Sequence, residues 1–197
     1  MRIGILNLGL SNLFSITSAV RRLGAEVVLL EKPIDSVDAF IFPGVGNFTE
    51  AVSRIEEIRK DVLDYIGSGK PFLGVCLGMQ MLFESSEEGP GAGLGVFRGR
   101  ITRLRAAKVP HMGWNRIIPV RPSPLTEGIQ PGEYAYFMHS YAPQPVDERI
   151  VIATTSYQTD FPSIIGEGAV YGTQFHPEKS GRTGEKILKN YIRIARR

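Results

Sequence analysis

Apolar residues recur along the chain with two spacings, one typical of helices and one typical of strands. Between Leu13 and Leu23 they return every three or four positions, which predicts an amphipathic helix. Ser11 or Asn12 provides its cap, and Gly24 provides its stop. Short apolar runs predict strands over residues 1–6, 26–31, 38–42 and 72–75, and the helical spacing returns over residues 48–66 and 77–84. This alternation predicts a parallel, doubly wound α/β sheet.

The spacing changes in the second half of the chain, where the runs become short and rich in β-branched and aromatic residues. Such runs occupy residues 115–120, 134–138, 149–156 and 169–175. They predict antiparallel strands added to the same core. The proline-rich stretch over residues 119–131 predicts a surface loop. We therefore expect one domain over residues 1–197, a mostly parallel sheet flanked by helices with antiparallel additions in the C-terminal half.

The composition is that of a globular chain that needs no covalent cross-links. With 197 residues, 43% of them hydrophobic, the chain is long enough to bury roughly 70% of its unfolded surface. One cysteine excludes an intramolecular bridge and suits a reducing cytoplasm. The first apolar run is too short for a signal peptide, and no stretch approaches the roughly 20 apolar residues of a membrane span. Three scattered histidines give no metal-ligand spacing, so we expect neither a metal nor another cofactor.

The net charge of +3 and an isoelectric point of about 9.1 invite a nucleic-acid hypothesis. Part of the positive charge lies over residues 186–197, on the solvated face of a predicted helix whose other face is apolar. A second basic cluster lies over residues 98–108, around a strand-like run. It lacks interleaved aromatic residues and any nucleic-acid motif, so a docking surface for a protein is the better interpretation.

The only cysteine of the chain stands at a predicted strand-to-helix junction. Cys76 is bracketed by Gly74 and Gly78 and follows the strand that ends at Val75. A side chain raised on such a sharp turn needs neighbours without Cβ atoms, as in a nucleophile elbow. A helix that begins at Leu77 would place its N-terminal dipole beside the sulfur and favour the thiolate. A buried structural cysteine is the alternative, and the glycines and the motifs below argue against it.

Two further motifs supply what acyl chemistry at Cys76 lacks. His176 could accept the thiol proton, and Glu178 would point to the same face of an extended chain and orient the imidazole. Pro177 favours extended backbone at His176. The turn over residues 43–46 contains two glycines, which let bare N–H groups approach an oxyanion. This turn and Cys76 both follow predicted parallel strands, whose carboxyl ends share one edge of a sheet, so we expect them to meet there.

Several strings of the sequence resemble those of the class I (triad) glutamine amidotransferases, whose shared reaction is hydrolysis of the glutamine side-chain amide. They are PGVGNF, GVCLGMQ and QFHPEKSG. Other strings are similar to one branch of that family, the glutaminase subunits of imidazole glycerol phosphate synthases. They are NLGLSN, KVPHMGWN and YFMHSY, and the likeness covers essentially the whole chain. Ser11 departs from this branch, which usually has glycine there.

The resemblance implies a flavodoxin-like fold and assigns roles to residues of this chain. The implied triad is Cys76, His176 and Glu178. The implied oxyanion site is Gly44, Val45, Gly46 and Leu77. The implied substrate contacts are Gln80, Ser140 and Tyr141, for which a solvent-facing helix position or a strand-end role is the alternative. His111 and His139 receive no role, since each could be a hydrogen-bonded loop or core histidine.

The resemblance also implies a partner. It is a separate (β/α)₈ synthase subunit that uses the ammonia to form imidazole glycerol phosphate and an aminoimidazole carboxamide ribonucleotide in histidine biosynthesis. The residues that would face it are Asn12, Trp114, Tyr136 and Lys179. Each has a structural alternative as a cap, a core aromatic or a solvated lysine. Trp114 is the strongest of them, because exposed tryptophans are common interface anchors.

Two other functions remain open. The chain could serve another amidotransferase complex, such as pyridoxal phosphate synthase, although the string PHMGWN argues against it. It could also be a non-catalytic binding module of the same fold. The intact set of Cys76, His176 and Glu178 argues against that reading, because a binding module needs no thiol nucleophile.

Overall fold

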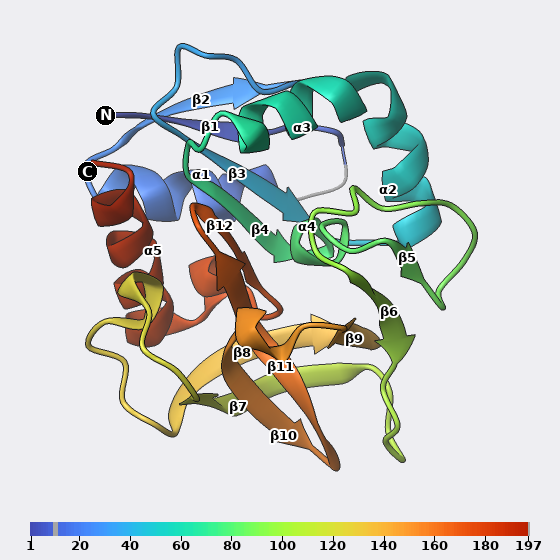
Figure 1. Ribbon diagram of the computed structural model, residues 1–197. Helices are drawn as coiled ribbons and strands as arrows, with labels where there is room; N and C mark the ends of the chain where they lie inside the picture. Colours follow the sequence, from blue (N-terminus) through green and yellow to red (C-terminus); the bar gives the residue numbers. More distant parts are fainter. Residues whose placement is uncertain (10–11, 197) are drawn as a thin grey trace.

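A nine-stranded sheet runs through the computed structural model, which describes residues 1–9 and 12–196 (Figure 1). The strand order is β2-β1-β3-β4-β12-β11-β10-β7-β8. β12 joins two halves of this sheet, because it is parallel to β4 on one side and antiparallel to β11 on the other. The departure from the family pattern at Ser11 lies outside the described residues.

The parallel half is built from segments whose apolar runs predicted strands. Its members are β1 (Arg2–Leu6), β2 (Glu26–Leu30), β3 (Ala39–Gly44), β4 (Phe72–Cys76) and β12 (Val170–Thr173). Continuous apolar runs suit strands that are covered on both faces. β3 and β4 end at the same edge of the sheet, where Gly44 lies beside Cys76 in the register. The predicted meeting of these two strand ends is confirmed.

Helices cover both faces of the parallel half (Figure 1). They are α1 (Leu13–Arg22), α2 (Phe48–Ile55), α3 (Arg59–Gly67), α4 (Leu77–Gln80) and α5 (Gly181–Ile194). On one face, Ile16 of α1 and Leu188 of α5 join the apolar cluster that contains Ile41 of β3. On the other face, Phe48 of α2 joins the cluster that contains Phe42 of β3. Alternate residues of one strand therefore serve two cores, which confirms the doubly wound prediction.

The C-terminal half adds antiparallel strands to the same sheet, and the short runs predicted three of the four. They are β7 (His111–Pro119), β8 (Glu133–His139), β10 (Val151–Tyr157) and β11 (Thr159–Glu167). No run predicted the strand over residues 159–167. The run over residues 169–175 forms β12, which is parallel to β4, so the prediction of an antiparallel strand there is wrong on that side.

A second, three-stranded sheet was not foreseen. It contains β5 (Ser85–Ser86), β6 (Gly99–Arg103) and β9 (Tyr141–Pro145). Short 3₁₀ turns are η1 (Glu56–Ile58), η2 (Pro124–Thr126), η3 (Glu148–Ile150) and η4 (Pro177–Lys179).

Two predicted helices differ from the structure. The helix expected over residues 48–66 is interrupted by η1, and the guanidinium of Arg59 at the start of α3 donates to the carbonyls of Ala92 and Gly93. The helix expected over residues 77–84 ends at Gln80. Beyond that residue, backbone carbonyls of residues 81–84 accept N–H groups of residues 93–97 instead of those of a next helical turn. Tertiary hydrogen bonds therefore override the apolar pattern.

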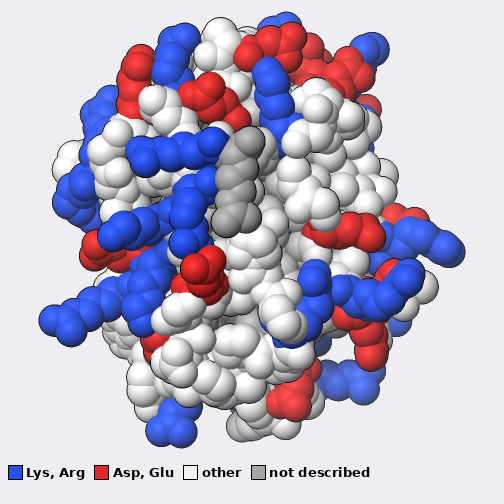
Figure 2. Space-filling view, turned by 60° about the vertical axis from the view of Figure 1, so that its left-hand side comes forward, with Lys and Arg blue, Asp and Glu red and all other residues white. Residues whose placement is uncertain are grey.

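Charged side chains of both signs are interspersed on the face shown in Figure 2. Within α5, Lys186 pairs with Glu133, and Arg193 pairs with Glu127. Two cations of the closing helix are therefore neutralised by Glu127, which precedes β8, and by Glu133, its first residue.

Within the described part of the chain, no helix combines the length and apolarity needed to cross a membrane.

Candidate active site

The backbone turns sharply at Cys76, between β4 and α4. The φ angle of Cys76 is 54°, in the left-handed region that non-glycine residues adopt rarely and that occurs disproportionately at functional sites. A Cβ on Gly78 would lie 1.8 Å from the carbonyl oxygen of Phe42, and one on Gly74 would lie 2.6 Å from the carbonyl oxygen of Gly78. The glycine bracket thus has a packing cause, because β3, β4 and α4 approach more closely than side chains permit.

His176 and Glu178 follow β12, the strand beside β4. Nδ1 of His176 lies 2.9 Å from Oε1 of Glu178, and both side chains are buried. His176 has the extended backbone that Pro177 predicts, but Glu178 lies in the 3₁₀ turn η4. The expectation that extended backbone carries both residues is therefore wrong at Glu178. Pro177 explains both conformations, since it disfavours helix before itself and its own φ suits the first position of a turn.

Burial and charge act in opposite directions on His176. Burial lowers the pKa of the imidazole, but Cys76 and Glu178 raise it more, so that the pKa rises from 6.5 to about 10. Among the described residues, Nε2 of His176 and Oε2 of Glu178 are buried atoms without a hydrogen-bond partner. The ring is therefore charged near neutral pH, and its Nε2–H remains available to a reacting atom.

The sulfur of Cys76 lies between elements that are remote in the sequence. Sγ lies 3.8 Å from the carbonyl oxygen of Met138 and accepts from Nε2 of Gln174 at 3.7 Å. Gln80 donates from Nε2 to Oε1 of Gln174 at 3.2 Å and to the carbonyl of Tyr141 at 3.0 Å. These contacts connect the nucleophile turn to the junction of β8 and β9.

A cavity of about 230 Å³ opens beside Cys76. Residues predicted for the oxyanion and substrate sites that line it are Val45, Gly46, Leu77, Gln80, Ser140 and Tyr141. Gly44 lies at the end of β3, where a Cβ would stand 2.9 Å from Cβ of Leu77. Gln80 is buried, so the alternative of a solvent-facing helix residue is wrong. The geometry thus brings the predicted oxyanion turn, the thiol and the predicted substrate contacts to one place.

The cavity and the thiol also meet residues to which the sequence assigned no role. They are Glu88, Pro110, Met138, His139 and Gln174. Met138 and His139 stand in the string YFMHSY beside two predicted contacts, and Gln174 stands two positions before His176. Pro110 stands in the string KVPHMGWN, before His111. Glu88 carries no such local signal, because it reaches the cavity from the loop beyond β5.

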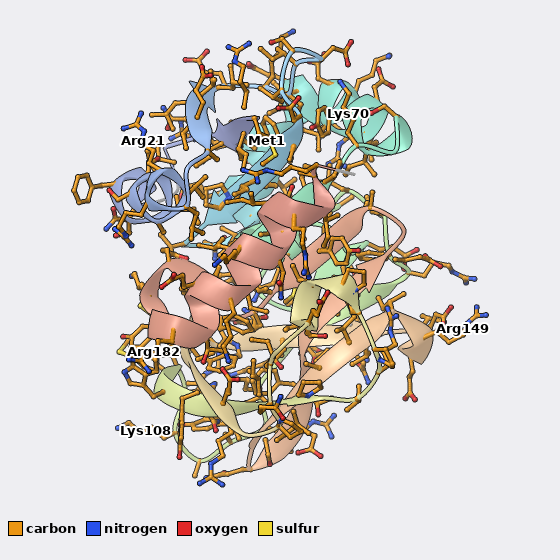
Figure 3. The ribbon with its side chains drawn as sticks, turned by 90° about the vertical axis from the view of Figure 1, so that its left-hand side faces the viewer. Met1, Arg21, Lys70, Lys108, Arg149 and Arg182 are labelled. Carbon is orange, nitrogen blue, oxygen red and sulfur yellow. The ribbon has the colours of Figure 1, made fainter. Side chains whose placement is uncertain are left out.

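The residues expected to face a partner come from four different elements of the fold. Trp114 is 55% exposed, and its ring meets that of Tyr136 edge-on, with centroids 5.9 Å apart. The carbonyl of Tyr136 accepts the backbone N–H of His176 at 3.0 Å, and Lys179 follows in η4. Asn12 caps α1, which contacts both η4 and α5 (Figure 3). The reading of Trp114 as a core aromatic is therefore wrong, and Trp114, Tyr136 and Lys179 lie near the turn that carries His176.

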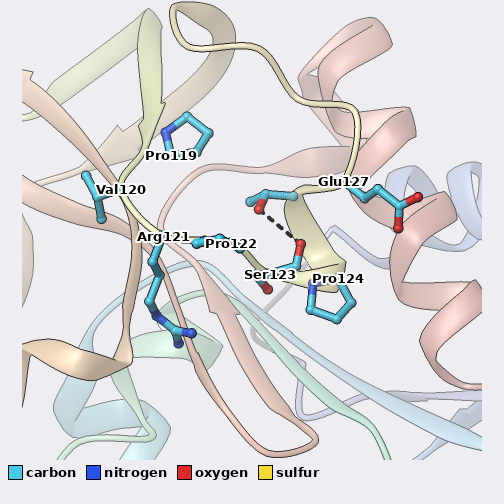
Figure 4. A pocket seen from close by; sticks show the side chains of 8 residues that line it. Pro119, Val120, Arg121, Pro122, Ser123, Pro124 and Glu127 are labelled. Carbon is cyan, nitrogen blue, oxygen red and sulfur yellow. Dashed lines mark hydrogen bonds between the residues drawn. The ribbon is translucent and has the colours of Figure 1, made fainter.

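A larger cavity, of about 660 Å³, lies in the proline-rich loop (Figure 4). It is lined by residues 119–124, 126 and 127. The guanidinium of Arg121 donates there to the carbonyls of Val151 and Gly166, at 3.0 and 2.5 Å. These bonds tie the loop to β10 and β11, so we assign this region a structural role. Residues 1–9 and 12–196 contain no group of His, Cys, Asp or Glu side chains that could hold a metal ion.

Comparisons with known proteins agree with this geometry. The family model "Glutamine amidotransferase class-I" matches residues 5–194. The imidazole glycerol phosphate synthase subunit HisH of Geobacillus kaustophilus is 45% identical, with coverage of 98% of this chain and 97% of that protein. The HisH subunit of Sulfolobus acidocaldarius is 43% identical, with 100% coverage of both. A crystal structure of a glutamine amidotransferase has a TM-score of 0.78 at 21% identity and covers 99% of each chain. The chain belongs to the class-I glutamine amidotransferase family.

Proposed function

We propose that this chain is the glutaminase subunit of an imidazole glycerol phosphate synthase, with Cys76, His176 and Glu178 as its catalytic residues. The observation that carries the proposal is the strained turn that holds Cys76 at a cavity, near a buried imidazole paired with a carboxylate. A binding module of the same fold would have no use for this set. The likeness to HisH subunits over the whole chain favours this synthase over another amidotransferase complex.

The reaction is acyl transfer through a thioester. The thiolate of Cys76 attacks the side-chain amide carbon of glutamine, and the proton on Nε2 of His176 passes to the departing ammonia. Water then attacks the thioester carbon while the neutral imidazole accepts its proton. Glutamate leaves, and the thiolate and the imidazolium are restored. Glu178 orients the ring and stabilises its charged form, and the raised pKa of His176 supplies the proton that the leaving group needs.

The residues around Cys76 divide into two groups by their expected roles. Backbone N–H groups of Val45, Gly46 and Leu77 stabilise the oxyanion, with Gly44 allowing the turn to pack on α4. Gly46 has a φ angle of 120°, which suits glycine and gives this turn freedom to adapt. The second group holds the amino-acid end of glutamine and consists of Gln80, Ser140 and Tyr141. No cofactor takes part in this reaction.

The ammonia passes to a separate (β/α)₈ synthase subunit, which docks on the face formed by Asn12, Trp114, Tyr136 and Lys179. An exposed tryptophan packed edge-on against a tyrosine supports this assignment, since such residues anchor interfaces. Residues 1–197 act as one amidotransferase domain. We place the chain in the cytoplasm, where a nucleophilic cysteine stays reduced.

Activity is expected to depend on the partner. The turn over residues 44–46 must present N–H groups to the oxyanion, and a resting and a competent arrangement of such a turn differ by a few kcal/mol. A partner that binds the competent arrangement tenfold more tightly shifts the equilibrium by about 1.4 kcal/mol. The isolated chain should therefore hydrolyse glutamine slowly.

The deciding experiment measures glutamate release by the purified chain alone, with the synthase subunit, and with that subunit plus its nucleotide ligand. We expect the last condition to exceed the first by at least about tenfold. Equal rates in all three would contradict the coupling and leave a freestanding glutaminase. Absence of glutamate release in every condition, with product still formed from added ammonium, would contradict the glutaminase assignment itself.

A further inference from the structure

His111 and His139 take no part in the reaction above, yet both are buried near the cavity. They face each other across the ribbon of β7 and β8, and His139 lines the cavity. Nδ1 of His111 lies 3.1 Å from Nε2 of His139. The ring of His111 is stacked between Phe137 and Tyr157, at centroid distances of 4.8 and 4.1 Å. This packing restrains the ring plane, so the hydrogen bonds at its edge have a defined direction.

A chain of hydrogen bonds with a single donor direction passes through the two imidazoles. Oδ1 of Asn115 accepts the next backbone N–H at 2.7 Å, and its Nδ2 donates to the carbonyl of Ser156 at 2.9 Å. These bonds fix the amide orientation, so Nδ2 also donates to Nε2 of His111 at 3.2 Å. His111 must then carry its proton on Nδ1 and donate to Nε2 of His139. His139 in turn donates from Nδ1 to the carbonyl of Tyr141 at 2.8 Å.

Both rings are neutral in this arrangement. Burial lowers the pKa of His111 to about 4. Burial also lowers the pKa of His139, to about 3, and outweighs the hydrogen bond to the Tyr141 carbonyl, which raises it. A neutral imidazole has one N–H and one acceptor nitrogen, which is what each position of the chain requires.

The chain of hydrogen bonds ends on the wall of the cavity. The carbonyl of Tyr141 accepts from His139 and from Gln80, so both of its lone pairs are engaged. Gln80 also donates to Gln174, whose amide donates to the sulfur of Cys76. A carbonyl held by two buried donors cannot turn away without leaving both donors unsatisfied, which is unfavourable in a buried site. The Tyr141 side of the cavity is thereby held at a fixed position relative to the sulfur of Cys76.

We propose that His111 and His139 are positioning residues that fix the Tyr141 wall of the glutamine cavity through a one-directional hydrogen-bond relay from Asn115. The inference rests on the proposed glutaminase function. It gives a physical reason for the two strings PHMGWN and YFMHSY, which together contribute every member of the relay. The strings meet because β7 and β8 pair in the register that sets His111 opposite His139.

The kinetic test compares two replacements of His139 in the complex with the synthase subunit. His139→Phe retains a ring but donates nothing, whereas His139→Asn retains a donor near the position of Nδ1. We expect His139→Phe to raise the KM for glutamine by about tenfold with a smaller change in kcat, and His139→Asn to recover most of that loss. Tyr157→Phe is the matched control, because it keeps the ring on His111 and loses only the hydroxyl bond to Lys108. A KM for His139→Phe equal to that of the parent would overturn the proposal.

A second test uses the parent chain, so its result does not depend on whether a variant folds. Ring ¹⁵N shifts of histidine-labelled protein report which nitrogen carries the proton. We expect His111 and His139 to show Nδ1–H and a bare Nε2 between about pH 6 and 8, although free neutral histidine favours Nε2–H. An Nε2–H pattern or a charged ring at either residue would overturn the relay. Because these shifts do not depend on turnover, a chain that shows the expected pattern and releases no glutamate would contradict the proposed function and not the relay.

Discussion

The parallel and antiparallel halves of the sheet contribute different things to the same cavity. In the parallel half, Cys76 ends β4, and His176 follows the neighbouring strand β12. In the antiparallel half, β8 ends at His139, and residues 138–141, which lead from β8 into β9, also line the cavity. Parallel strands bring their carboxyl ends to one edge, which suits a set of reacting groups that must meet. An antiparallel ribbon instead presents a continuous edge against which a substrate can be held.

The ribbon of β7 and β8 also has two usable faces. Along β7, His111 and Asn115 point toward the cavity side, while Met112 and Trp114 are 60% and 55% exposed on the other face. Strands of the parallel half are covered by helices on both faces, so they have no free face for a partner. Variants in the parallel half should therefore alter catalysis or folding, and variants in the ribbon should alter substrate fit or docking.

The largest effect is expected at the nucleophile of the parallel half. Cys76→Ala should lower glutamine-dependent turnover by at least roughly 10⁴-fold, since loss of a nucleophile in a comparable triad costs about 10⁶-fold. The ribbon is untouched, so the complex with the synthase subunit should still form and should make product from added ammonium. Glutamine-dependent turnover that survives in the variant, measured as glutamate release, would sink the assignment of Cys76.

The next effect is expected at the orienting carboxylate. Glu178→Gln should slow glutamine turnover by about 10-fold to 10⁴-fold, the upper value being that of a serine protease whose orienting acid is lost. The loss should appear in kcat. If the steady-state kinetics of the variant equal those of the parent, Glu178 has no catalytic role, and only Cys76 and His176 form the catalytic set.

The same variant has an expected effect on the pH dependence of stability. Because folding raises the pKa of His176 from 6.5 to about 10, its contribution to the free energy of unfolding is fully present below pH 6.5 and is lost as the pH rises toward 10. Glu178 is one of the groups that raise this pKa, so Glu178→Gln should show a smaller loss over that window. Urea unfolding of both proteins at the two ends of the window measures the difference, and identical slopes would contradict the linkage.

A smaller effect tests why the parallel half needs its glycines. A Cβ at Gly78 would lie 1.8 Å from the carbonyl oxygen of Phe42, so Gly78→Ala should lower the free energy of unfolding by about 3 kcal/mol. Gly67→Ala is the matched control, because that glycine ends α3 with no atom within 4 Å of the added Cβ. The control should be neutral or more stable by up to about 1 kcal/mol. Equal stability of the two variants in urea would show that the turn tolerates a side chain.

The smallest effect concerns the outer face of the ribbon. Trp114→Ala should weaken docking of the synthase subunit by about 30-fold, the equivalent of about 2 kcal/mol for an aromatic anchor. Unstimulated glutamate release by the isolated chain should be unchanged. Val146→Ala, a truncation at another exposed apolar residue, is the control and should leave the Kd unchanged. Calorimetric titration measures both, and equal Kd values for the two variants would remove Trp114 from the docking face.

The sequence was sufficient to predict features that depend on residues close together along the chain. The turn at Cys76 was predictable because its sequence signal is local: an apolar strand, two glycines and a short helix start. The close approach of Phe42 in β3 to Gly78 was not predictable in the same way. The contact of His176 with Glu178 was predictable from a separation of two positions, although its backbone route was not. The parallel, doubly wound half followed from the alternation of periods along the chain.

The tertiary structure decided what depends on remote segments. α4 ends at Gln80 because residues 93–97 bind the carbonyls that a longer helix would need. Met138 contacts the thiol because β8 lies over the nucleophile turn, and Gln174 contacts it from the end of β12. The two histidines form a directed pair because β7 pairs with β8. A sequence specifies the donors and acceptors of such bonds, whereas the register of β7 against β8 decides which donor meets which acceptor. The reacting groups and the wall residues Ser140 and Tyr141 could therefore be predicted from this sequence, and the hydrogen bonds that hold the wall in place could not.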